Sequence, residues 1–347
     1  MPYKHTLKKT LGALMLSSLA ATVLASEPGA PAAKANVYAN YPVTVPGYTG
    51  DKTTSVAYTG QIARHVLHDS LKKLASQGNG QPNAELKEKM MAYYAGKDAG
   101  RAILAPRSKD GFNIEETQVD QISKGKNLAG KTASADIDGM PGNMNARALI
   151  EFWIHKASGA NKGADMTHGY DYQQLISKFI LGAVFYNQAT TVYLDKYLAA
   201  DKKPNNEPYK AGAAYTGKEH SWDEAFGYFG MPANGANLDA KTLYNIAKQK
   251  PEAMSAANDD GDDTIELYGE MVFSPAYYAA SFDKSGKTTY AADIMQAFLE
   301  GRALITSANG QVLTDAQRTQ LRGFAQTVST NWEKVYAEAV FKYAGSV

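Results

Sequence analysis

The stretch of residues 172–198 constrains the fold more than any other part of the chain, because a helix built from it has no polar face. A helix that is apolar all round belongs in a protein core or in a membrane. Charged or amide residues interrupt it at Lys178, Asn187 and Asp195, so we expect a buried core helix rather than a membrane span. The apolar residues are Leu175, Ile176, Phe179, Ile180, Val184, Phe185, Val192, Tyr193, Leu194 and Tyr197.

Apolar residues recur at helical spacing on both sides of this stretch. Asn83 can cap a helix that follows it, and Thr314 with Gln317 has the spacing of a capping box. No segment shows the alternation of a half-buried strand, so we expect an all-α fold of helical bundles with about eight to ten helices. The other predicted helices cover residues 61–74, 115–128, 145–156, 238–248, 264–272, 290–307 and 314–343.

A short sequence repeat relates two of the predicted helices. The letters Tyr-Thr-Gly occur at residues 58–60, ahead of His65, and again at residues 215–217, ahead of His220. This short repeat predicts two pseudo-repeated halves, although chance explains three matching residues about as well.

The N-terminus has the pattern of a secretory signal peptide over residues 1–25. A basic start precedes an apolar stretch, residues 11–24, that is too short for a membrane span, and small residues favour cleavage after Ala25. Ser26 stands where a lipoprotein would need a cysteine. We therefore expect the mature protein to be periplasmic or secreted.

After cleavage, an extended lead-in over residues 26–54, where prolines exclude a helix, should precede an all-helical domain over residues 55–347. The chain has no cysteine, so its core alone must stabilise it, and a thiol nucleophile is excluded. The net charge of +1 argues against nucleic acid as a partner. The 22 tyrosines suit a helical core with hydroxyl groups at its edge.

Residues 217–230 concentrate an imidazole, three carboxylates and four aromatic rings. We interpret the four rings mainly as packing groups. His220 and Glu224 are four residues apart and share one helix face, with Asp223 beside them. Nitrogen and oxygen donors at this spacing suit zinc, iron or copper. We therefore predict a metal site at His220, Asp223 and Glu224, with a hydrogen-bonded core pair as the alternative. Glu219 points away from this face, which predicts a solvated side chain.

One helix supplies an incomplete set of metal ligands, so other helices must complete such a site. Candidates are Glu266 and Glu270, which are four residues apart, and His65 or His68. The charged neighbours of the two histidines suit a solvent-facing helix, which makes these histidines weaker candidates for metal ligands.

Several familiar catalytic and metal-binding patterns are absent from the sequence. The zinc-protease helix His-Glu-x-x-His does not occur, and neither does a nucleophile elbow, a phosphate loop or a dinucleotide fingerprint. The acidic residues 259–263 fail the calcium-loop pattern, which would put Ala256 and Leu267 at ligand positions. We expect these carboxylates to be solvated at the positive end of helix 264–272.

Four blocks of sequence resemble, in their order and wording, an exported bacterial family of unknown function whose members are often lipoproteins. The blocks are residues 58–64, 175–190, 220–230 and 301–303. The most specific of them reads His-x-Trp-Asp-Glu-Ala-Phe-Gly-Tyr-Phe-Gly. The resemblance covers most of the mature chain.

That family in turn resembles the imelysin-like periplasmic proteins, which are all-helical, built of two bundle halves and associated with iron uptake. Their signature is Gly-x-His-x-x-Glu. Here Gly217 lies one position earlier than the signature glycine, and Asp223 stands at its acidic position with Glu224 next. The resemblance implies a metal role for His220 together with Asp223 or Glu224.

The leading hypothesis is a periplasmic helical protein that binds a metal ion, iron or zinc, with iron favoured, or a metal complex during metal uptake. Its partners would be periplasmic or outer-membrane uptake proteins. Two alternatives stay open: a metal-dependent hydrolase with Glu224 as the base for a bound water, and a non-catalytic structural or interaction protein. A binding role is favoured over an enzymatic one.

Overall fold

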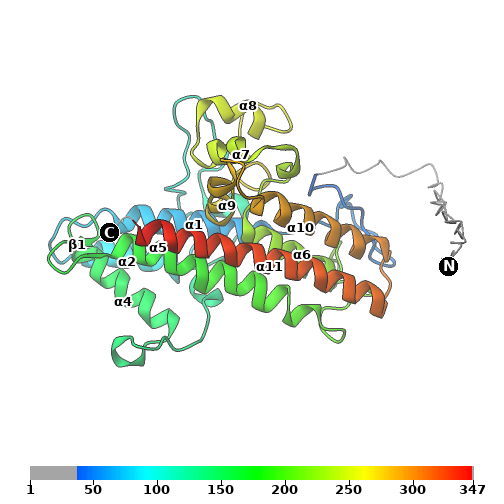
Figure 1. Ribbon diagram of the computed structural model, residues 1–347, viewed down its shortest axis with the longest axis horizontal. Coiled ribbons are helices and arrows are strands. Elements are labelled where there is room, and N and C mark those ends of the chain that lie inside the picture. Colours follow the sequence, from blue (N-terminus) through cyan, green and yellow to red (C-terminus); the bar gives the residue numbers. More distant parts are fainter. Residues whose placement is uncertain (1–36, 346–347) are drawn as a thin grey trace, which may run out of the picture. The chain divides into compact units, whose positions relative to one another are not determined.

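The computed structural model describes residues 37–345. Regular structure in the described part is almost entirely helical (Figure 1), which confirms the all-α prediction. The α-helices are α1 (Thr59–Ala75), α2 (Ala84–Tyr94), α3 (Val119–Ile122), α4 (Ala146–Gly159), α5 (Tyr172–Ile180), α6 (Gly217–Phe229), α7 (Ala240–Ala247), α8 (Met254–Ala257), α9 (Ser274–Asp283), α10 (Tyr290–Ser307) and α11 (Asp315–Ala344).

Extended structure is minor in residues 37–345. The strands β1 (Ala164–Asp165) and β2 (Tyr170–Asp171) form one short antiparallel ladder. Single 3₁₀ turns occur at η1 (Ala129–Lys131), η2 (Pro141–Asn143), η4 (Lys196–Leu198), η5 (Gly235–Asn237) and η6 (Pro251–Ala253). The predicted signal peptide and its cleavage site lie outside the described residues.

The apolar stretch of residues 172–198 forms two joined helices and ends in the 3₁₀ turn η4. α5 continues without a break in helical backbone into η3 (Leu181–Tyr193), which is a π-helix. Ile180, Val184 and Phe185 are fully buried, which confirms a core helix. A π-helix of this length is rare, and π-helical turns often occur at functional sites.

α6 lies against η3, α1 and α10, so the chemistry-rich segment is central to the fold. Trp222, Phe226 and Phe229 are fully buried, as the packing interpretation predicted. Gly301 of α10 permits the close approach, because a Cβ added there would lie 2.0 Å from the Trp222 ring. The Trp222 ring of α6 therefore packs directly on the backbone of α10 at Gly301.

The C-terminal helices α10 and α11 lie side by side as a hairpin, and α7 and α8 lie above the long helices in the same view (Figure 1). The predicted capping box is confirmed: the Thr314 hydroxyl accepts from the Gln317 amide at 3.2 Å, and the Gln317 side chain accepts from the Thr314 amide at 2.9 Å. Asn83 also caps α2, accepting from the Leu86 amide at 2.9 Å.

Two predicted helices are wrong. Residues 264–272 are not helical, because the amide of Ile265 pairs with the Asn113 carbonyl at 2.9 Å and its own carbonyl accepts from the Glu115 amide at 3.1 Å. The predicted helix over residues 115–128 shrinks to the single turn α3. Ile265 is buried from this non-helical backbone. Before α3, the Thr117 carbonyl accepts from the Ile103 amide at 2.8 Å, and the Val119 amide donates to the Arg101 carbonyl at 2.9 Å. In both places tertiary pairing overrides local helical preference.

The described part of the lead-in, residues 37–54, contains no helix, in keeping with its prolines. It is nevertheless fixed to the core. Tyr38 is fully buried and stacks on Phe226 with ring centroids 3.8 Å apart, and its amide donates to the Ala233 carbonyl at 2.8 Å. This segment therefore contributes to the interior beside α6.

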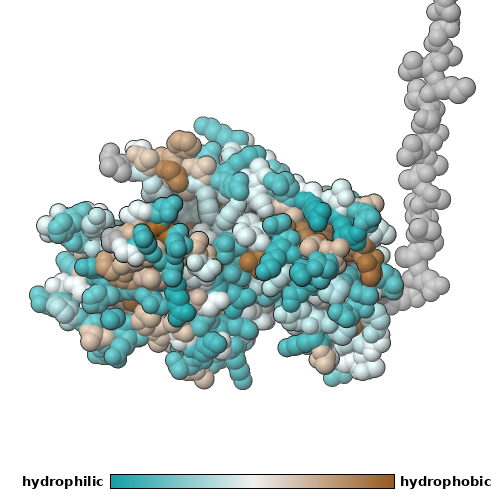
Figure 2. Space-filling view, turned by 90° about the horizontal axis from the view of Figure 1, so that it is seen from below, coloured by the Kyte–Doolittle hydropathy of each residue, from teal (hydrophilic) through white to brown (hydrophobic). Residues whose placement is uncertain are grey.

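The face drawn in Figure 2 is mostly hydrophilic, and its hydrophobic residues form small, separate patches. Among residues 37–345, no helix combines the length and the apolar character that a membrane crossing requires.

Candidate functional site

The start of α6 is fixed by a capping box that the sequence analysis did not identify. The Thr216 hydroxyl accepts from the Glu219 amide at 3.1 Å, and the Glu219 carboxylate accepts from the Thr216 amide at 2.8 Å. Gly217 packs against the chain at Lys203, since a Cβ added at Gly217 would lie 2.9 Å from the Lys203 Cα. These contacts set the rotation of α6, and with it the direction of each side chain.

His220 and Glu224 come together on one face of α6, as their spacing predicts. Nε2 of His220 lies 3.8 Å from Oε1 of Glu224, and the side chains are 15% and 16% exposed. Nδ1 of His220 lies 3.1 Å from the Ala57 carbonyl. A carbonyl only accepts, so Nδ1 carries the proton in that bond and Nε2 faces Glu224. Burial lowers the pKa of His220, which favours the neutral imidazole.

Neighbouring elements fix the orientation of both side chains. The ring of His220 lies against Tyr209 and Tyr215, with centroids 4.5 Å away in each case. Gln61 of α1 donates its amide to Oε1 of Glu224 at 2.7 Å. The pair is therefore held in place by α1 and by the loop that precedes α6.

Asp223 and Glu219 occupy a different stripe of α6, which faces α10. The Arg302 guanidinium donates through Nε to Asp223 at 2.9 Å and through Nη1 to Glu219 at 3.1 Å, and all three side chains are fully buried. The other oxygen of Asp223 accepts from the Ala57 amide at 3.0 Å. Burial raises the pKa of Asp223, which the charge of Arg302 opposes.

The solvated position predicted for Glu219 is wrong, because this carboxylate is buried in an ion pair with Arg302. The structure does not place Asp223 beside His220 and Glu224 as a third convergent side chain. It connects Asp223 to His220 through one residue: the Ala57 amide donates to Asp223 and the Ala57 carbonyl accepts from His220. Asp223 therefore positions the backbone that orients the imidazole.

A family model described as "Domain of unknown function (DUF4856)" matches residues 48–323. The chain belongs to this family. The DUF4856 match includes all of α6 and Arg302, so both stripes of the helix lie within it. No curated protein and no solved structure matches the sequence.

The other ligand candidates in the DUF4856 domain lie elsewhere in the fold. Nε2 of His65 lies 3.0 Å from the Gly227 carbonyl, and His68 contacts Asp69 and Ser177. Both histidines are buried, so the solvent-facing interpretation of their helix is wrong.

Of the paired candidates Glu266 and Glu270, the Glu270 carboxylate is held by local backbone amides. Glu270 accepts amide hydrogens from Asp259 at 2.6 Å and from Glu266 at 2.9 Å. Within residues 37–345, no group of three or more His, Cys, Asp or Glu side chains is arranged to hold a metal ion.

Basic and hydroxyl side chains near Glu224 were missed by the sequence analysis. Lys131 donates from Nζ to the Tyr193 hydroxyl at 3.1 Å, at the end of the π-helix. Burial raises the pKa of Tyr193 and lowers the pKa values of Lys126 and Lys131, while the charge of Glu224 raises those of the two lysines. Perturbed groups that converge on a partly exposed acid are typical of a functional site.

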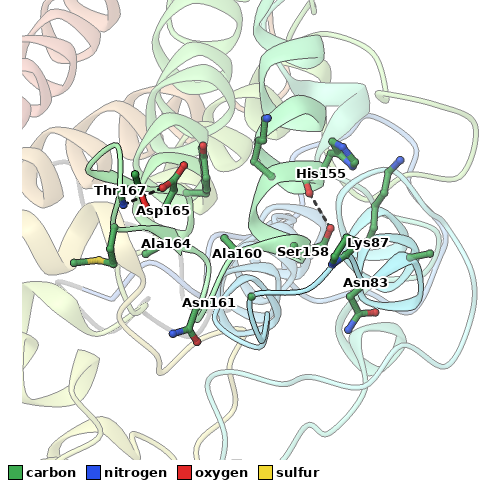
Figure 3. A pocket seen from close by; sticks show the side chains of 16 residues that line it. Asn83, Lys87, His155, Ser158, Ala160, Asn161, Ala164, Asp165 and Thr167 are labelled. Atoms are coloured by element: carbon green, nitrogen blue, oxygen red, sulfur yellow. Dashed lines mark hydrogen bonds between the residues drawn. The ribbon is translucent and has the colours of Figure 1, made fainter.

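A separate cavity of about 730 Å³ lies beside α2, α4 and β1 (Figure 3). Lys87 and His155 line one side of it, and Asp165 and Thr167 line the other. No residue of α6 lines this cavity, so it is distinct from the His220–Glu224 pair.

Proposed function

We propose that this protein is a periplasmic metal-binding protein that takes part in metal uptake, with iron as the favoured metal, bound as an ion or as a complex. His220 and Glu224 would be its metal ligands. The observation that carries the proposal is their geometry: Nε2 and Oε1 lie 3.8 Å apart on one helix face, and both side chains are partly exposed.

The surroundings of the pair support a role as ligands. A metal-binding histidine usually donates its other ring nitrogen to a carbonyl or carboxylate, which leaves a lone pair for the metal. His220 has this arrangement, since its Nδ1 donates to the Ala57 carbonyl. Glu224 is oriented by the hydrogen bond that it accepts from the Gln61 amide. The two donors fit iron or zinc, which accept imidazole and carboxylate ligands.

The resemblance to imelysin-like proteins supports iron uptake and a periplasmic location, and uptake proteins of the periplasm or outer membrane would then be partners. In this chain the geometry favours Glu224 as the acid that acts with His220. Asp223 would act indirectly, because both of its oxygens already accept hydrogen bonds in the core.

The test is the metal content and affinity of the purified protein, using iron and zinc salts and ferric citrate as probes. We expect His220→Ala and Glu224→Gln each to weaken binding by about tenfold or more. His168→Ala is the matched control, because His168 forms an exposed pair with Asp165 at 2.9 Å. Absence of binding, or equal binding by wild type and His220→Ala, contradicts the proposal and leaves a packing role for the pair.

A further inference from the structure

The loop that carries Lys126 and Lys131 is fastened to the core by its backbone. Arg101 donates from Nη2 to the Lys126 carbonyl at 2.7 Å, and Gln188 of η3 donates to the Lys131 carbonyl at 3.0 Å. Both donors are buried. The two lysines are therefore presented from a fixed backbone rather than from a free loop.

The lysine side chains reach the start of α1 and the end of η3, close to Glu224. A Cβ added at Gly60 would lie 3.0 Å from Cε of Lys126 and 3.5 Å from Nη1 of Arg64. Both cationic side chains therefore lie beside Gly60. The next residue along α1 is Gln61, whose amide binds Glu224. Lys131 donates to the Tyr193 hydroxyl at the end of η3.

Lys203 adds a further positive charge on the side of His220. Its Nζ lies 4.5 Å from the centroid of the Tyr209 ring, and that ring lies against His220. Arg64, Lys126, Lys131 and Lys203 are defined here as the cationic group.

The cationic group has a surplus of positive charge. In residues 37–345, none of its four members forms a salt bridge, and Glu224 is the acid whose charge acts on both Lys126 and Lys131. Glu219 and Asp223 are already paired with Arg302. Partly buried cations without ion-pair partners are costly, and an anionic ligand would relieve that cost.

We infer that this site binds a ligand with two or more carboxylate groups and that the metal arrives as its chelate. The cationic group would bind free carboxylates of the ligand, while His220 and Glu224 face the metal. A bare metal cation would be repelled by the surrounding positive charge, whereas a chelate with net negative charge is attracted. The metal half of this inference rests on the proposed function, and the carboxylate half rests on the cationic group alone.

The experiment is calorimetric titration of the full mature protein with citrate, ferric citrate and inorganic phosphate, in low salt and in about 0.5 M NaCl. We expect ferric citrate to bind, salt to weaken it, and Lys126→Gln or Lys131→Gln to reduce affinity by about tenfold. Lys203→Gln is a second variant on the other side of the site. The exposed Lys87, which lines the separate cavity, supplies the control Lys87→Gln.

Each outcome separates the two proposals. Binding of ferric citrate that depends on His220 but not on the lysines overturns the inference and leaves the proposed function standing. Binding of citrate that depends on the lysines, without a preference for the ferric form, supports the carboxylate site and contradicts the metal function. Phosphate bound as tightly as citrate, with the same lysine dependence, overturns the assignment to carboxylates. Citrate and ferric citrate both failing to bind overturns it as well.

Discussion

At the scale of single residues, Arg302 is the side chain on which the interior of the site depends most. It is fully buried, it donates to Asp223 and Glu219, and it lies 4.8 Å from the centroid of the Tyr41 ring. Removing one member of a buried ion pair leaves the other members charged and without a partner in a medium of low polarity.

Arg302→Met should therefore lower the free energy of unfolding by about 3–5 kcal/mol. Urea unfolding followed by circular dichroism measures the change. Arg147→Met is the matched control, because Arg147 forms an exposed pair with Glu151 and should change stability by less than about 0.5 kcal/mol. Similar small effects for both variants would show that the buried pair contributes little.

His65 should make the fold sensitive to acid. Burial lowers its pKa from the ordinary value of 6.5 to about 3, with Asp69 opposing the shift and His68 adding to it. The unfolded chain therefore takes up a proton that the folded chain excludes, so stability should fall as pH drops from about 6.5 towards about 3, by up to about 1.4 kcal/mol per unit.

The check is the slope of unfolding free energy against pH between about 6 and 4.5. His65→Gln keeps a donor for the Gly227 carbonyl and removes the titrating ring. The slope of its unfolding free energy against pH should therefore be shallower than that of the wild type, by up to about 1.4 kcal/mol per pH unit. An unchanged slope in His65→Gln would mean that other groups cause the acid sensitivity.

At the scale of elements, α6 shows what its sequence could and could not specify. Four-residue spacing predicted correctly that His220 and Glu224 share a face, and the separate interpretation of the aromatic rings as packing groups is confirmed. It could not show that Glu219 is buried, because a carboxylate in a helix looks solvated until its cation is known. That cation, Arg302, lies in α10, 83 positions from Glu219 along the chain.

The contact between α6 and α10 makes a testable prediction at this scale. A Cβ at Gly301 would overlap the Trp222 ring at 2.0 Å, so Gly301→Ala should destabilise the protein by about 1–3 kcal/mol. Gly323→Ala in α11 meets nothing within 4 Å and should stabilise the helix by about 0.5–1 kcal/mol. Thermal unfolding compares the two; equal effects would contradict the close approach of α6 and α10.

At the scale of the whole molecule, the fold class was predictable because helical periodicity is local and recurs along the chain. The extended pairing of Ile265 with residue 113 was not, since it depends on a partner about 150 positions away. The cationic group was missed for the same reason: in the sequence, Lys126 falls in a predicted helix, Lys131 and Lys203 fall in polar loops, and nothing local connects them. Only the folded chain fixes Lys126 and Lys131 near Glu224, through Arg101 and Gln188, and places Lys203 over the Tyr209 ring beside His220.

The central claim is that His220 binds a metal through Nε2 while Nδ1 stays bonded to Ala57. Nitrogen-15 NMR of the histidine-labelled protein, titrated with gallium citrate as a diamagnetic substitute for ferric citrate, tests this most directly. The account predicts that Nε2 of His220 shifts to a metal-bound position, that the other histidines stay unchanged, and that Glu224→Gln weakens the effect. Unchanged His220 resonances at saturating metal, or shifts confined to other histidines, would contradict it.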